Sequence, residues 1–146
     1  MALFSCAGTR PTNLGLTDGR LAACPSSPNC VSSDAAVSDT THYVAPLVLA
    51  TDPATARRAA GQVVTRQPRT QIIEESPEYL YAECTSARMG FVDDLELNLR
   101  PADGVIAVRS ASRIGYGDLG VNRKRVEDVR GALISAGVVR PGPESR

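Results

Sequence analysis

Two adjacent segments in the second half of the chain, residues 91–100 and 105–114, alternate between apolar and polar side chains. A period of two residues over this length is typical of β-strands. The four residues between the segments, Pro-Ala-Asp-Gly, favour a tight connection. The sequence therefore predicts a long antiparallel hairpin, and any fold for this chain has to accommodate it.

The register of this hairpin decides which side chains meet. If the loop closes symmetrically, Leu95 faces Ser110 and Asp93 faces Ser112, with all four side chains on one face. That face begins as ordinary hydrophobic core near the loop and becomes polar toward the open end. A core face that turns polar at one end is typical of the rim of a ligand pocket.

The remaining patterns predict a single α+β domain over residues 41–139, with a curved antiparallel sheet and two helices packed on one face. The element order is β-α-β-β-β-β-α. Residues 1–40, rich in Ser, Thr and Pro, are expected to form an N-terminal coil packed on the domain, and residues 140–146 a tail. Besides the hairpin, we expect strands at 42–50, 70–75 and 79–85 and helices at 51–67 and 121–135.

Charge and hydropathy limit the class of protein. The 146 residues include sixteen basic and sixteen acidic side chains, so the net charge is zero and nucleic-acid binding is not expected. No apolar stretch reaches the ~20 residues of a membrane-spanning helix, so no membrane span is expected. The first residues lack the apolar stretch of a secretory signal, and we expect a cytoplasmic protein without an exported leader.

A glycine-rich segment follows the hairpin and leads into the second helix. Residues 114–120 hold three glycines, which allow the backbone to approach a ligand closely. Either Asp118 or Asn122 is expected to cap the helix, whose first turn presents N–H donors and a partial positive charge. Together with Ser110 and Ser112, this segment predicts a binding site at the end of the sheet.

The arginines near this site favour an anionic ligand. Fifteen of the sixteen basic residues are arginine, a side chain suited to carboxylate and phosphate recognition. Arg113 and Arg123 flank the glycine-rich segment, and we expect them to hold an anionic group together with the helix N–H donors. Arg109 is expected to add charge, although the register places it on the other face, opposite Glu96.

Asp93 is the candidate for acid–base chemistry. A carboxylate on a mainly apolar face loses hydration and therefore accepts a proton more readily. Tyr116, which lies between two glycines, is the candidate proton donor. The competing interpretation is that Asp93 only forms hydrogen bonds with Ser110 and Ser112 at the end of the sheet, and that the glycines make a tight turn.

Cys24 and Cys30 enclose a five-residue loop that contains two prolines. A disulfide, two free thiols and a redox-active pair all fit this spacing. A zinc site would need further ligands, and only Cys84 and His42 are available, so we expect neither a metal nor another cofactor. Cys84 is expected in the core and His42 in a structural role.

Four stretches carry a family resemblance: Arg-Pro-Thr-Asn-Leu-Gly at 10–15, Cys-Pro-Ser-Ser-Pro-Asn-Cys-Val-Ser-Ser at 24–33, Phe-Val-Asp-Asp at 91–94, and the arginine- and glycine-rich run at 109–125. They resemble the domain of unknown function 1499 family, small proteins of bacteria and plastids. The resemblance implies a shared set of positions and no reaction, because the family carries no established activity. Many relatives are membrane-attached or lumenal.

The leading hypothesis is a single-domain protein that binds a small anionic molecule at the end of the sheet. If it is an enzyme, the side chains favour cofactor-free proton transfer, as in an isomerase, cyclase or dehydratase. One alternative is a non-catalytic interaction module, in which the cysteine loop and the glycine-rich turn form a surface for another protein. The other is a thiol redox role for the cysteine pair.

Overall fold

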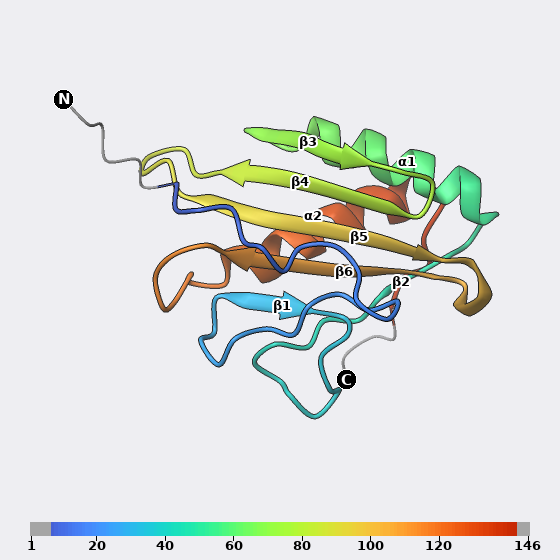
Figure 1. Ribbon diagram of the computed structural model, residues 1–146. Helices are drawn as coiled ribbons and strands as arrows, with labels where there is room; N and C mark the ends of the chain where they lie inside the picture. Colours follow the sequence, from blue (N-terminus) through green and yellow to red (C-terminus); the bar gives the residue numbers. More distant parts are fainter. Residues whose placement is uncertain (1–6, 143–146) are drawn as a thin grey trace.

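The computed structural model describes residues 7–142 and confirms the predicted α+β class. One unclosed antiparallel sheet carries both helices on the same face (Figure 1). No helix within residues 7–142 is long and apolar enough to cross a membrane. The elements are β1 (Cys30–Ser32), β2 (Leu47–Val48), α1 (Pro53–Arg66), β3 (Thr70–Glu75), β4 (Tyr79–Thr85), β5 (Val92–Arg100), β6 (Val105–Ser112) and α2 (Val121–Ser135).

The hairpin of β5 and β6 has the predicted register, with Asp93 opposite Ser112 and Leu95 opposite Ser110. A short 3₁₀ turn joins the strands and ends at Gly104, which has a φ of 64°. Glycine adopts this left-handed conformation without the steric strain that a Cβ would add. The sheet runs in the order β1-β6-β5-β4-β3, so the hairpin lies at its centre.

The hydrophobic core lies between the sheet and the two helices. The helix expected at 51–67 is α1, which begins after Asp52; the Asp52 side chain accepts a hydrogen bond from the Thr55 N–H at 3.0 Å, and Pro53 occupies the first helical position. Burying one large aliphatic side chain contributes ~1.5–3 kcal/mol, so this layer supplies much of the stability. Its completely buried members include Leu47, Leu80, Leu95, Leu97, Ile106 and Leu133.

The edge next to β6 differs from the expectation. In place of one strand over 42–50, the structure has the two-residue β2, because Pro46 lacks the N–H that would extend the ladder. An additional strand, β1, lies inside the N-terminal segment and pairs with the end of β6, Val31 opposite Ser110. This strand has only three residues and follows a Pro- and Ser-rich stretch, so it is too short to show an alternating pattern in the sequence.

Residues 7–24, which we call the strap, cross the face of the sheet opposite the helices (Figure 1). Leu21 is buried there in a small cluster with Tyr79, Tyr81 and Ala107. The Gly15 N–H donates to a carboxylate of β5 at 2.8 Å. The sheet is therefore covered on both faces, by helices on one and by irregular chain on the other.

A disulfide joins Cys24 to Cys30 and fixes the end of the strap to β1. Closing so short a loop removes unfolded-state entropy worth about 2 kcal/mol. We expect the tryptic peptide 21–57, which contains both cysteines, to resist iodoacetamide in denaturant until a reductant is added. Peptide 70–88, with the free Cys84, is the control that reacts in both conditions. Two labels on peptide 21–57 without reductant would contradict the disulfide.

Candidate functional site

Asp93 is held at the start of β5, at the open end of the hairpin, on the face that packs against α2. Its Oδ2 lies 2.8 Å from Nη2 of Arg125, and the two side chains are only 11% and 15% exposed. The candidate acid–base residue is thus an ion-paired carboxylate. Its partner, Arg125, was not among the site residues predicted from the sequence. The sequence held one indication of this role: Arg125 follows Asn122 by three residues, and this spacing places both side chains on one side of a helix.

Asn122 is completely buried and connects the polar groups around Asp93. Its Nδ2 donates to Ser112 Oγ at 2.9 Å and to Asp118 Oδ2 at 2.8 Å. Its Oδ1 accepts hydrogen bonds from Ser110 Oγ at 2.7 Å and from Arg125 Nη1 at 2.8 Å. The two serines therefore bond to this amide and not to Asp93, and the network fixes α2 against the end of the sheet.

A cavity of about 300 Å³ opens beside Asp93 and Ser112, between the open end of the hairpin and the segment that leads into α2. This volume is at the lower end of the ~300–1,000 Å³ usual for small-molecule sites. The polar residues in its lining are Ser86, Asp93, Ser112, Arg113 and Asp118. The apolar side chains that line it are Phe91, Val92, Ile114, Leu119 and Val121.

Asp118 lies just before α2, whose N-cap residue is Gly120. Its carboxylate accepts hydrogen bonds from the N–H of Gly120 at 2.9 Å and of Asn122 at 3.0 Å. Burial opposes the ionisation of Asp118, but the hydrogen bonds from Asn122 outweigh it and lower the pKa of this carboxyl group. The chain's own carboxylate thus takes two of the helix N–H donors that the sequence analysis assigned to an anionic ligand.

Arg109 and Arg113 carry their guanidinium groups to the face under the strap, away from the serines. Arg113 Nη2 and Nε donate to Asp94 at 2.8 and 3.0 Å, and the Tyr81 hydroxyl donates to the same carboxylate. Hydrogen bonding to Asp94 raises the pKa of Arg113. Glu83 lies 3.1 Å from Arg113 Nη2. These groups form a buried ionic cluster that sequence analysis missed.

Glu96 and Arg109 form a second buried pair beneath the strap, at a longer separation of 3.7 Å. Glu96 Oε2 accepts hydrogen bonds from the Tyr79 hydroxyl at 2.6 Å and the Gly15 N–H at 2.8 Å. Among the described residues, Glu96 Oε1 and Arg109 Nε have no hydrogen-bond partner. Burial raises the pKa of Glu96 and lowers that of Arg109, so it disfavours both charges.

Glu96 gives a prediction for pH dependence. Burial raises its folded-state pKa above the ordinary value of 4.5, so the folded state binds this proton more tightly than the unfolded state. That stabilisation is complete below the ordinary value and is lost as pH rises through the raised pKa. The stability of wild type relative to Glu96→Gln, from urea unfolding at about pH 4 and about pH 8, should therefore fall as pH rises. A rise would contradict this, and the exposed Glu74→Gln is the control.

Two other residues from the sequence analysis lie outside the cavity. Arg123 donates to the carbonyl oxygens of Thr40, Thr41 and Tyr43 at 3.2, 3.1 and 2.9 Å. These bonds tie the loop that contains residues 40–43 to α2. Tyr116 is 74% exposed and does not line the cavity. Neither residue is positioned next to Asp93 or Ser112.

His42 lies between the Asp39 carboxylate, 2.8 Å from Nδ1, and the Ser27 carbonyl oxygen, 2.9 Å from Nε2. Hydrogen bonding to Asp39 raises the pKa of His42. The imidazole thus joins two segments of loop. Within residues 7–142, no three His, Cys, Asp or Glu side chains are grouped so that they could hold a metal ion.

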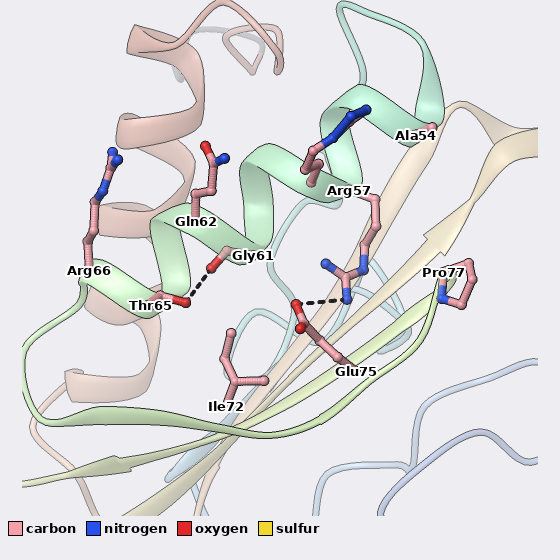
Figure 2. Close-up of a pocket in the computed structure, with 10 residues that line it drawn as sticks. Ala54, Arg57, Gly61, Gln62, Thr65, Arg66, Ile72, Glu75 and Pro77 are labelled. Atoms are coloured by element: carbon pink, nitrogen blue, oxygen red, sulfur yellow. Dashed lines mark hydrogen bonds and ion pairs between the residues drawn. The ribbon is translucent and has the colours of Figure 1, made fainter.

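Figure 2 shows a wider hollow, of about 620 Å³, between α1 and β3. Arg57 reaches from α1 to Glu75, at 3.5 Å, and donates to the carbonyl oxygens of Ser76 and Tyr79. Gly61 leaves the space for this contact, since a Cβ there would lie 3.2 Å from Arg57 Nη1. Arg57 and Glu75 at the base of this hollow therefore connect α1 to the turn between β3 and β4, and we assign them a structural role.

The comparisons with known proteins agree with the family resemblance. No curated protein matches the sequence. The family model described as "Protein of unknown function (DUF1499)" matches residues 20–133, a range that includes the central hairpin, the cavity and both buried ionic pairs. This match covers most of the chain, and the protein therefore belongs to the DUF1499 family.

Proposed function

We propose that this protein binds a small molecule in the cavity at the end of the sheet. The observation that carries the proposal is the cavity itself, about 300 Å³ in volume, with Asp93 and Ser112 on its wall. Large apolar side chains usually avoid water, yet Phe91, Ile114 and Leu119 line this space and remain exposed. A contiguous exposed apolar surface around a concavity is typical of a binding site.

The contacts around the cavity favour a ligand with an apolar body. Of the three arginines expected to hold an anion, only Arg113 lines the cavity, and Asp94 already binds its guanidinium group. Arg109 and Arg123 are engaged elsewhere. The proposal therefore keeps the predicted location and assigns no anion-binding role to these three side chains.

Binding, more than proton transfer, is the function that the geometry supports. Arg125 binds Asp93 Oδ2 at 2.8 Å, so the negative charge of this carboxylate is already balanced within the protein. The proposed donor Tyr116 lies outside the cavity lining. Asp93 and Ser112 are proposed instead as polar groups that orient the ligand.

The test uses N-phenyl-1-naphthylamine, a neutral apolar probe whose fluorescence rises when it enters an apolar site. We expect the probe to bind wild type and to bind Ile114→Lys about tenfold more weakly, a change of about 1.4 kcal/mol. Ile114 is 39% exposed, so lysine there should not disturb the core. The control is Val37→Lys, a 73% exposed position outside the cavity. Equal binding by Ile114→Lys and wild type, or no binding at all, would overturn the proposal.

A further inference from the structure

A second hollow adjoins the cavity on the other side of Asp93. It has a volume of about 350 Å³ and lies between the start of β3, the end of β4 and the first turns of α2. Ser86, Asp93 and Val121 line both spaces. The ion pair of Asp93 with Arg125 therefore lies at the boundary between two neighbouring depressions, and one ligand could contact both.

The two depressions differ in chemical character. The cavity is walled mainly by large apolar side chains, whereas three cationic side chains line the second hollow: Arg69, Lys124 and Arg125. Two carboxylates lie with them, Asp93 bound to Arg125 and Asp128 bound to Lys124 at 2.7 Å. The contact with Asp128 is exposed and contributes little, so Lys124 can turn to a new anionic partner at small cost. The second hollow carries one excess positive charge.

Backbone strain marks both depressions. Among residues 7–142, three residues other than glycine have positive φ, namely Asp18, Arg69 and Leu119. Asp tolerates this conformation, but it is unfavourable for Leu and Arg. Arg69, with φ of 49°, lines the basic hollow, and Leu119, with φ of 54°, lines the apolar cavity and is completely exposed. Strained positions of this kind cluster where a ligand is held.

We propose that the ligand is an amphipathic anion whose apolar chain occupies the cavity and whose carboxylate or phosphate group lies in the basic hollow. This inference rests on the proposed function and adds the ligand class. Arg69 and Lys124 would contact the anionic group directly. Arg125 would contribute charge while it remains bonded to Asp93, Ser110 and Asn122.

The experiment compares three probes with the same apolar chain, 1-octanol, octanoate and octyl phosphate, by calorimetry. We expect wild type to bind octanoate or octyl phosphate about tenfold more tightly than octanol. The double variant Arg69→Gln/Lys124→Gln should bind all three with the affinity of octanol. Arg58→Gln/Arg88→Gln removes two exposed arginines outside both depressions and should behave as wild type.

The outcomes separate this inference from the proposed function. If octanol and both anions bind wild type equally, or if Arg69→Gln/Lys124→Gln keeps the preference for anions, the assignment of the basic hollow is overturned while the apolar cavity stands. If N-phenyl-1-naphthylamine does not bind, the proposed function itself is overturned; if it binds and none of the three octyl probes does, only the assignment of the ligand class is overturned. A preference for octyl phosphate or for octanoate supports the inference and identifies the anionic group.

Discussion

Replacing Arg113 by methionine is expected to lower the free energy of unfolding by about 3–5 kcal/mol, because it leaves a buried carboxylate without its cation. Arg113 donates to Asp94, whose side chain is 1% exposed, and also contacts Tyr81 and Glu83. Methionine retains most of the apolar stem, so the loss reports the charge and its hydrogen bonds more than lost packing. Urea unfolding followed by circular dichroism measures the change.

The double variant Asp94→Leu/Arg113→Met provides the critical comparison. Removing both charges abolishes the unpaired carboxylate, so the double variant should regain at least half of the stability that Arg113→Met loses. Arg88→Met, at an exposed position on the loop before β5, is the control and should change stability by less than about 0.5 kcal/mol. If Arg113→Met matches Arg88→Met, Asp94 and Arg113 are not a buried pair.

Asn122→Ala is expected to lower the free energy of unfolding by about 2–4 kcal/mol, since it leaves several buried polar groups short of a partner. The amide side chain donates to Ser112, Asp118 and the carbonyl oxygen of Asn29, and it accepts from Ser110. Water cannot replace these bonds readily, because the Asn122 side chain is completely buried.

Amide hydrogen exchange, which measures local opening of the structure, gives a second test of Asn122→Ala. The same bonds hold α2 against the hairpin end, so amide hydrogen exchange should accelerate first in residues 112–122. Asn13→Ala, an exposed position in the strap, is the matched control. A loss below about 1 kcal/mol, with unchanged exchange in residues 112–122, would show that the network does not organise this end of the sheet.

The central hairpin could be predicted because its determinants are local. Alternation decides which side chains share a face, and the four-residue loop decides the register, so the pairing of Asp93 with Ser112 follows from adjacent sequence. The start of α1 is equally local, since Asp52 and Pro53 encode it directly. By contrast, β2 is shorter than its apolar pattern suggests, because Pro46 interrupts the ladder.

The face beneath the strap could not be predicted from the same pattern. Alternation places Asp94, Glu96 and Arg109 together on one face, and a charged face of a strand is normally in water. Its burial depends on the strap, which reaches Glu96 from Gly15 across 81 residues of sequence. No periodicity within either segment encodes that contact, so the buried pairs emerge only in the folded chain.

The position of Asp93 and Ser112 at the end of the sheet could be predicted, but their bonding partners could not. Asp93 and Ser112 do lie beside a cavity at the end of the sheet. The helix N–H donors were expected to be open to a ligand, yet Asp118 accepts from two of them. Arg125 was missed because only the packing of α2 on the sheet brings its side chain to Asp93.

Mapping a bound probe onto the backbone tests the central claim most directly. In ¹H–¹⁵N spectra recorded as octanoate is added, we expect the largest chemical-shift changes in residues 91–93 and 112–121, which surround the cavity, and smaller changes in residues 67–70 and 84–87, which line the basic hollow. Changes centred on the hollow between α1 and β3, changes spread evenly over the chain, or none at all would contradict a binding site at the end of the sheet.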